Sequence, residues 1–465
     1  MEEIQQTGER RKRKPTPFER FSQSYLPAII GATAILLILI FVIGAVVRGF
    51  QRRNLKIQLN HEAQIAAQQK KMELDKEFKS LIAGAAELAE KYEFEAAIQL
   101  LQTFSGNPQD YPTLERTINS YREELNSFEQ WTDFGAIPNL SFEMLIADPQ
   151  RAFKDANYAK SYKEKFITTE EFKLILEELY KNGYILIRLN DLYEYKQSDS
   201  GTSYFVEKDL YLPKGKKPLI MTQTQVNYNL YMVDSNSDWV ADAGGAGFAS
   251  KLIIDENGNF ANEYVTAEGT LETGAYDLIP ILESFIATHP DFSYRGARAV
   301  IALSGYNGVF GYRTQAEGLK KLGETAYNEE IEKAKLVAKK LQQTGYELAC
   351  YSYENKDYAK LTTDKIKADM SGWTAEVVPI LGKIDIFVMA RNSDLSSYTG
   401  DSYRFLKDSG FQFFLGYCKD GKPWVNVNDQ YVRQGRIWVT ASNLTNNKSW
   451  FNDILDPSVV LLENR

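Results

Sequence analysis

The sequence predicts an α/β fold in which parallel strands close, or nearly close, into a barrel surrounded by helices. Three observations predict this arrangement. Beyond Asp133, short and continuously apolar runs alternate with amphipathic helical patterns, as expected for parallel strands covered by helices. Seven such runs occur, which is enough to close a barrel. An uncharged apolar stretch near the N-terminus and a long helical pattern precede them, so we expect a transmembrane helix and a helical stalk before the barrel.

The apolar stretch runs from Leu26 to Val47 and carries no charged side chain. As a helix it would be about 33 Å long, which matches one crossing of a bilayer. Its apolar core is longer than that of a signal peptide, and it ends in the basic residues Arg48, Arg52 and Arg53. We therefore expect a retained membrane anchor rather than a cleaved leader.

The distribution of basic residues around the anchor predicts its orientation. Six precede the span and four follow it closely, namely Arg10, Arg11, Lys12, Arg13, Lys14 and Arg20 before it and Arg48, Arg52, Arg53 and Lys56 after it. Cytoplasmic flanks carry the excess of Lys and Arg, so residues 1–25 are predicted to be a basic cytoplasmic tail. The expected location is the cell membrane, crossed once at 26–47, with the C-terminal domain outside the cytoplasm.

Residues 48–133 show the spacing of helices rather than strands. Apolar side chains recur at steps of three, four or seven, and Gly106, Pro108 and Pro112 mark a turn between two helical segments. We expect a helical stalk or hairpin. An alternative is that this hairpin binds a protein partner.

Residues 134–465 carry the predicted barrel. The expected strands are 184–188, 219–222, 299–303, 347–351, 384–389, 412–415 and 436–439. The expected helices between them include 169–181, 276–287, 329–343 and 363–373. Two alternating runs joined across Asn257 and Gly258 predict one β-hairpin, which we place at the rim of the barrel.

Composition limits the function. The formal net charge is −8 and the basic residues cluster before the apolar stretch, which argues against a nucleic-acid partner. Cys350 and Cys418 lie in apolar runs and are predicted to be buried free thiols. The chain has 28 tyrosines and 6 tryptophans, more than a core requires, and rings on a surface are a common means of holding sugars.

In barrels of this type the functional residues follow the strands, where loops lead into helices. Three sequence segments resemble the polysaccharide deacetylase (NodB-homology) family at these places. They are ITTEEFKLILEELYKNGYILIRLNDLY, KGKKPLIMT and EKAKLVAKKLQQTGYELACYSYEN, and the resemblance covers roughly residues 137–455. It implies a distorted (β/α)7-type barrel and metal-assisted hydrolysis of an acetyl group.

The resemblance also shows what the chain lacks. It places the catalytic base at Thr224, the metal-binding carboxylate at Gln225 and two histidine ligands at Tyr351 and Asn355. Amide and phenol groups are poor zinc ligands compared with carboxylate and imidazole. The only histidines of the chain, His61 and His289, lie elsewhere in the sequence. We therefore expect no metal or other cofactor, and no deacetylation by the usual mechanism.

The predicted function is that of a membrane-anchored pseudo-deacetylase that binds cell-wall or capsular polysaccharide. Amide and carboxylate groups would bond sugar hydroxyls, and tyrosine rings would cover sugar faces. The predicted ligand-binding residues are Gln225, Asn227, Tyr228, Tyr306, Tyr351, Tyr353, Glu354, Asn355 and Arg391.

Two alternatives remain open from the sequence. The barrel could be an active glycan hydrolase, either an unusual deacetylase or a glycosidase that uses carboxylates among Asp191, Glu354 and Asp394. The chain could instead be a scaffolding protein whose stalk binds a partner while the barrel acts as a spacer.

Overall fold

The computed structural model describes residues 13–14, 16–201, 203–463 and 465, so Arg10, Arg11 and Lys12 of the predicted basic tail lie outside the described residues. The chain forms two compact units. The first contains residues up to Leu81 together with 104–106, and the second contains residues 82–103 and 107–465.

The first unit is helical. Helix α1 (Pro17–Ser24) begins at Thr16, whose hydroxyl accepts from the Glu19 backbone in a capping box. Helix α2 (Leu26–Ala89) follows, and its apolar portion is entirely exposed. The described part of the chain has one helix that is long enough and apolar enough to cross a membrane, and this helix is α2. Its length and composition are compatible with a single-pass anchor or with a signal sequence.

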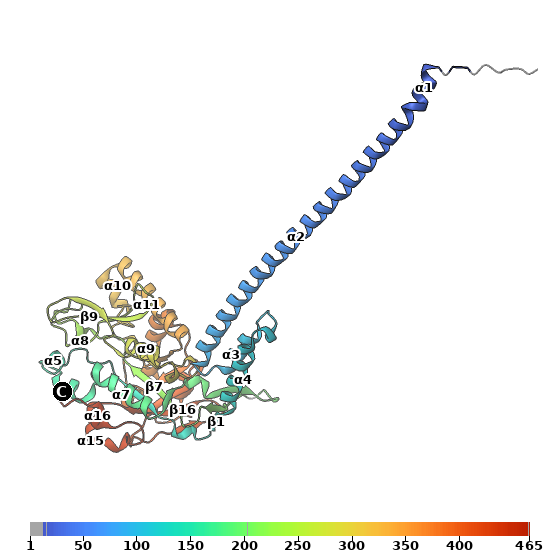
Figure 1. The fold of residues 1–465 in the computed structure, drawn as a ribbon. Helices are drawn as coiled ribbons and strands as arrows, with labels where there is room; N and C mark the ends of the chain where they lie inside the picture. Colours follow the sequence, from blue (N-terminus) through green and yellow to red (C-terminus); the bar gives the residue numbers. More distant parts are fainter. Residues whose placement is uncertain (1–12, 15, 202, 464) are drawn as a thin grey trace, which may run out of the picture. The chain divides into compact units, whose positions relative to one another are not determined.

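The second unit is built on a closed barrel of seven parallel strands, which confirms the predicted fold class (Figure 1). In order around the barrel these strands are β11 (Val300–Leu303), β12 (Glu347–Cys350), β13 (Ile386–Val388), β14 (Phe413–Tyr417), β16 (Val432–Trp438), β2 (Asn139–Phe142) and β7 (Lys217–Thr224). The ring closes where β7 pairs with β11, with Thr222 opposite Val300. All seven strands therefore end at the same rim.

One strand predicted for the barrel forms in the structure but is not part of the closed ring. Strand β3 (Tyr184–Leu186) pairs with the start of β7, forms a single bridge from Leu186 to Ser293, and lies outside the ring. The seventh ring strand is β2, which the sequence did not reveal. Its Asn139 and Ser141 are polar, whereas Leu140 and Phe142 pack in the cluster that includes the surrounding helices. The apolar run typical of a buried parallel strand is therefore missing from β2.

The predicted helices are present with small shifts at their ends. They are α7 (Thr169–Lys181), α9 (Leu278–Thr288), α11 (Glu324–Thr344) and α12 (Thr363–Gly372), the last followed by a π-helical turn at Trp373–Val377. The further helices of this unit are α5 (Pro149–Ala152), α6 (Ala159–Lys165), α8 (Leu230–Val233), α10 (Ala316–Leu322), α13 (Val378–Leu381), α14 (Asp401–Asp408), α15 (Ala441–Asn446) and α16 (Pro457–Val460).

The predicted β-hairpin is confirmed and has a third strand. Strands β8 (Lys251–Ile254) and β9 (Phe260–Val265) are antiparallel, and β10 (Leu271–Gly274) pairs with the free edge of β9. The turn between β8 and β9 contains Gly258 with φ of +80°, a conformation that glycine adopts without strain.

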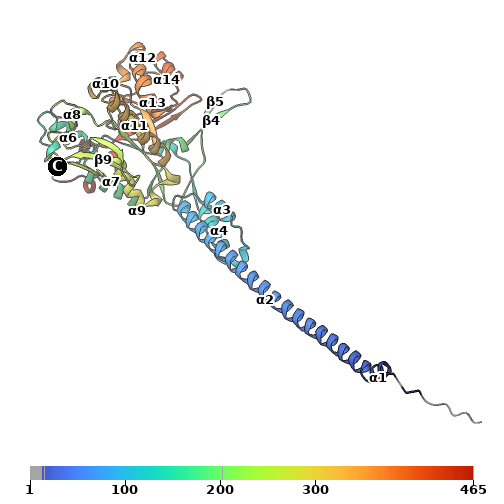
Figure 2. The same ribbon diagram turned by 90° about the horizontal axis from the view of Figure 1, so that it is seen from above.

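The segments before the barrel also pack in the second unit. Helices α3 (Phe94–Gln102) and α4 (Pro112–Asn126) lead to β1 (Glu129–Trp131), which pairs with β6 (Leu210–Leu212). Tyr92 donates a hydrogen bond to the Asp291 carbonyl, at 3.0 Å. Strands β4 (Tyr193–Gln197) and β5 (Ser203–Glu207) form a hairpin that projects from this unit (Figure 2), while β15 (Val425–Val427) pairs with β16.

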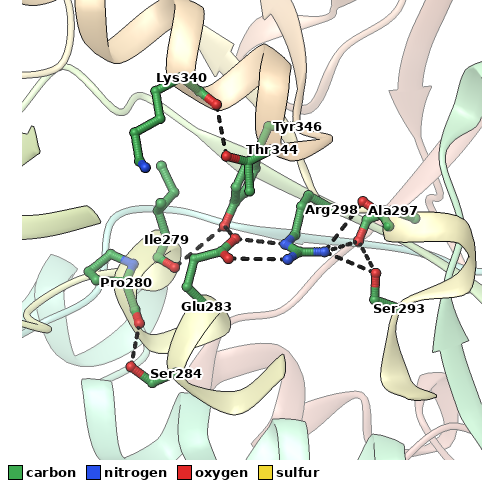
Figure 3. A network of polar contacts seen from close by, with 11 residues as sticks. Ile279, Pro280, Glu283, Ser284, Ser293, Ala297, Arg298, Lys340, Thr344 and Tyr346 are labelled. Carbon is green, nitrogen blue, oxygen red and sulfur yellow. Dashed lines mark hydrogen bonds and ion pairs between the residues drawn. The ribbon is translucent and has the colours of Figure 1, made fainter. Parts of the chain in front are cut away.

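A polar network joins α9 to the segments that enter β11 and β12 (Figure 3). The Arg298 guanidinium donates to both oxygens of Glu283, at 2.7 and 3.2 Å, and to the Ser293 hydroxyl at 2.9 Å. The Tyr346 hydroxyl donates to Glu283 at 2.8 Å. Glu283 therefore holds one helix to two strand entrances at the amino-terminal end of the barrel.

Candidate ligand-binding site

A cavity of about 440 Å³ lies at the carboxyl-terminal end of the barrel strands. Several ring strands contribute the residue at or just beyond their end, including Glu143 after β2, Gln225 after β7, Tyr351 after β12 and Trp438 at the end of β16. The remaining lining residues are Tyr158, Ser161, Tyr162, Lys165, Phe166, Asn229, Tyr231, Tyr306, Glu354, Asn355, Arg391 and Asn392. This is the place at which barrel folds hold their ligands.

Three side chains in the cavity form a continuous hydrogen-bonded chain. Asn355 donates its Nδ2 to Gln225 Oε1 at 2.9 Å, and Gln225 donates its Nε2 to Glu143 Oε2 at 2.9 Å. The three residues follow β12, β7 and β2, so the chain connects three separate strand ends. Each amide is oriented by the group beside it.

Glu143 is the carboxylate in this series of three hydrogen-bonded side chains. Burial raises its pKa to about 7, because the charged form loses hydration. Hydrogen bonds from Thr224 and Gln225 and the positive charges of Arg436 and Arg391 oppose the shift. A carboxyl group with this pKa is present in both protonation states near neutral pH, so it can give or accept a proton in the cavity.

The loops that carry the site are held in unusual backbone conformations. Gln225, Asn355 and Arg391 have φ of +60°, +53° and +61°, the left-handed region that non-glycine residues seldom adopt. Such residues each cost of the order of 1 kcal/mol and persist when the surrounding structure fixes them. Arg391 is fixed by two bonds, from its backbone nitrogen to the Tyr351 hydroxyl at 3.3 Å and from Nε to the Asn355 carbonyl at 3.2 Å.

The four positions that the resemblance assigns to metal-dependent chemistry do not fit a divalent metal. Gln225 bonds Asn355 and Glu143 through both polar atoms of its amide, and Asn355 offers a single unbonded, neutral amide oxygen. Burial raises the pKa of Tyr351 to about 12, so its phenol stays neutral. Thr224 is buried and donates its hydroxyl to the Phe142 carbonyl. Among the described residues, no group of three or more His, Cys, Asp or Glu side chains is arranged to hold a metal ion.

Six of the predicted ligand-binding residues line the cavity together. They are Gln225, Tyr306, Tyr351, Glu354, Asn355 and Arg391. Tyr306 is 46% exposed, whereas Tyr351 is buried beneath the cavity with its hydroxyl toward Arg391. Glu354 forms an ion pair with Lys356, which partly compensates its charge.

Three other predicted residues do not line the cavity. Asn227 is buried and holds the loop after β11, donating to the Ser304 and Gly308 carbonyls. Tyr228 is buried and donates its hydroxyl to Asp277 at 2.8 Å. Tyr353 donates its hydroxyl to Glu376. Their bonds are internal, and each supports a loop or core element rather than facing the cavity.

Of the three carboxylates considered for glycosidase chemistry, only Glu354 lines the cavity. Asp191 accepts from Arg188 at 2.8 Å in the turn after β3, which pairs with the amino-terminal end of β7. Asp394 forms an ion pair with Arg433 and accepts from the Tyr398 hydroxyl at 2.6 Å. The structure therefore does not bring Asp191, Glu354 and Asp394 to one cleft.

The remaining residues singled out from the sequence have structural environments. His289 ends α9 and stacks on Phe285, with ring centroids 4.3 Å apart. Cys350 and Cys418 are buried free thiols, as predicted.

The sequence missed two groups of cavity residues. Glu143 follows β2, the strand that was not recognised, so no strand end drew attention to it. Tyr158, Tyr162 and Tyr231 come from the segments around α6 and α8, which are too short to show a helical period. Tyr158 and Tyr231 contact each other with ring centroids 5.3 Å apart, and they are 42% and 47% exposed.

No protein-family model matches the chain, and no curated protein matches it. Among solved structures, the chain is similar to the Streptococcus pyogenes deacetylase PplD in complex with acetate. The similarity has a TM-score of 0.34 at 11% sequence identity and covers 67% of this chain and 96% of that one.

Proposed function

We propose that this protein is a membrane-anchored, pseudo-deacetylase-like receptor that binds bacterial cell-wall or capsular polysaccharide in the barrel cavity. The observation that carries the proposal is the composition of this cavity. Hydrogen-bonding amides and carboxylates line its depth, and exposed tyrosine rings lie among its lining residues. Sugars present hydroxyl groups at their edges and C–H groups on their faces, and this lining offers partners for both.

Different lining residues would bind the hydroxyl groups and the faces of a sugar. Glu143, Gln225 and Asn355 offer oriented donors and acceptors for hydroxyls. Tyr231 and Tyr306 offer accessible rings for sugar faces. Because the positions that the resemblance assigns to metal ligands hold two amides joined by a hydrogen bond and a neutral phenol, binding without metal-dependent hydrolysis is the function we infer.

The test uses the full chain in detergent micelles or nanodiscs. Metal content by mass spectrometry and acetate release from acetylated peptidoglycan fragments and chitooligosaccharides are measured beside binding of the same fragments by calorimetry. We expect binding without stoichiometric metal and without acetate release. Tyr231→Ala should weaken binding about tenfold or more, whereas Tyr195→Ala, an exposed tyrosine on β4, should not. Stoichiometric zinc with turnover would refute the proposal.

A second candidate function is favoured by Glu143. A carboxyl with a pKa of about 7 in a ligand cavity is suited to general acid–base catalysis, and Glu354 is a second carboxylate on the same cavity. The chain would then be a metal-independent glycan hydrolase. Reducing-sugar release from cell-wall glycan that Glu143→Gln abolishes would support it, and the absence of any release would exclude it.

The location of this function is also part of the proposal. Helix α2 would hold the chain in the cell membrane through residues 26–47, with the N-terminus in the cytoplasm and the barrel outside it. A protein partner at the stalk, residues 48–133, remains a prediction from the sequence.

A further inference from the structure

A buried cation whose hydrogen-bond partners are all neutral lies at the cavity end of the barrel. Arg436 is 2% exposed, and its guanidinium donates to the Gly416 carbonyl at 3.1 Å, the Ser141 hydroxyl at 2.9 Å and the Met389 carbonyl at 2.8 Å. All three acceptors are neutral. Within the described residues Arg436 forms no salt bridge, and burial lowers its pKa. The Glu143 carboxylate acts on Arg436 electrostatically without bonding to it, and a buried cation with only neutral hydrogen-bond partners favours an anion nearby.

The cavity itself contains polar atoms that lack partners. The Tyr162 hydroxyl and the Trp438 indole N–H line it, are buried and form no hydrogen bond to any described residue. Tyr162 is 2% exposed, so water at the surface does not satisfy its hydroxyl. Unpaired buried donors each cost about 1–3 kcal/mol, a cost that a bound acceptor would remove.

Two cations on the same cavity are free to bind a ligand. Arg391 is exposed and uses its backbone nitrogen and Nε on the protein, while its two terminal nitrogens form no bond to the described residues. Lys165, at the end of α6, is also exposed and forms no ion pair within the described chain. The planar guanidinium fork is suited to two oxygens of one anion.

The carboxylates of the cavity compensate these charges only in part. Glu354 is paired with Lys356. Burial raises the pKa of Glu143 to about 7, so near neutral pH it carries only part of a negative charge. Arg391 and Lys165 therefore remain as unpaired cations on the cavity, beside one buried amide oxygen, Asn355 Oδ1, that also lacks a partner among the described residues.

Building on the proposed glycan-binding function, we propose that the cavity recognises an anionic group on the glycan, a carboxylate or a phosphodiester, held by Arg391 and attracted by the charges of Lys165 and of the buried Arg436. The Trp438 and Tyr162 donors complete the site. The ligand class is thus an acidic polysaccharide segment rather than a neutral one.

The experiment compares ligands of the same backbone with and without the anion. The full chain in nanodiscs is titrated by calorimetry with a peptidoglycan tetrasaccharide that carries free lactyl carboxylates and no peptide, and with chitotetraose, its neutral counterpart. A glycerol-phosphate hexamer provides the phosphodiester. We expect the carboxylate or the phosphodiester ligand to bind at least tenfold more tightly than chitotetraose, and the two acidic ligands identify the source of the anion.

Arg391→Gln tests the assignment, because the variant keeps most of the side-chain size and removes the charge. It should lower the affinity for the preferred acidic ligand at least tenfold, a much larger loss than it causes for chitotetraose. Arg404→Gln is the matched control, since Arg404 is an exposed arginine on α14, paired with Asp401, that does not line the cavity. Circular dichroism checks that both variants fold.

Two results would overturn the inference. Equal affinity for acidic and neutral ligands, or an acidic preference that survives in Arg391→Gln, would leave glycan binding intact and refute anion recognition. No binding of any of the three ligands would refute the proposed function together with this inference.

Discussion

Asn355 donates to Gln225 across the barrel rim, at 2.9 Å, and so joins the loops that follow β12 and β7. Both residues line the cavity at the carboxyl-terminal end of the barrel strands. Gln225 is bonded through both polar atoms of its amide, whereas Asn355 Oδ1 is buried without a partner among the described residues.

The bond between these two amides predicts a measurable coupling. Gln225→Ala and Asn355→Ala should each lower the free energy of unfolding by about 1–3 kcal/mol, because the partner is left unpaired. The double variant should lose less than the sum, with a coupling of about 0.5–3 kcal/mol. Chemical unfolding of the chain in detergent measures all three. Asn392→Ala controls for the backbone, since Asn392 has a similar φ of +52°. Additive losses would contradict a direct bond.

Glu143 predicts a dependence of stability on pH. Its pKa is about 7 in the folded chain, above the usual value of 4.5. Below pH 4.5 it is protonated in both states and has no effect. As the pH rises toward 7 the unfolded chain releases the proton first, so ionisation opposes folding by up to about 3 kcal/mol.

Glu143→Gln should remove this effect. The variant and the parent chain should differ least near pH 4.5, and the variant should gain relative stability up to about pH 7, beyond which the difference levels off. Melting temperatures across this pH range measure it. Parallel curves for the two proteins would show that Glu143 titrates normally.

The network shown in Figure 3 predicts that an arginine cannot be replaced by lysine. Arg298 bonds both oxygens of Glu283 and the Ser293 hydroxyl, and lysine lacks the fork to do so. Arg298→Lys should destabilise the chain by about 1–3 kcal/mol in chemical unfolding. Arg404→Lys replaces an exposed arginine and should change stability by less than about 0.5 kcal/mol. Equal losses of stability in the two variants would mean that the network contributes little to the free energy of unfolding.

The orientation in the membrane can be tested with single cysteines, because Cys350 and Cys418 are buried and should not react. In intact cells, a membrane-impermeant maleimide should label Lys419→Cys, on an exposed loop of the barrel unit, and spare Lys14→Cys, before the span. Labelling after detergent lysis confirms that both thiols are reactive. The reverse pattern would place the barrel in the cytoplasm.

The sequence predicted the barrel because six of its seven strands are apolar runs, and they are apolar because helices cover the barrel. It could not predict β2, whose polar residues point to internal partners. Asn139 accepts from Thr222 at 2.7 Å and donates to Gln434 at 3.1 Å, and Ser141 accepts from Arg436. These partners are distant in sequence, so the residues next to β2 do not indicate that its polar side chains are buried in a strand.

The sequence pattern likewise reveals only some of the residues that line the cavity. Gln225, Tyr351 and Asn355 were found because they follow recognisable strands. Glu143 follows the hidden strand, and Tyr158, Tyr162 and Tyr231 come from connecting segments whose position only the folded chain determines. Tyr228 and Asn227 followed a strand too, yet their side chains turn to Asp277 and to the loop at Ser304.

The left-handed backbone at Gln225, Asn355 and Arg391 has a consequence for how a ligand is selected. Loops held in such conformations by their own hydrogen bonds are ordered before any ligand arrives, so little entropy is lost when one binds. A site of this kind does not change its conformation to fit different ligands. In the proposed function, such a site selects from a heterogeneous polymer the stretch whose shape already matches, and hydrogen exchange in these three loops should change little between the free and bound protein.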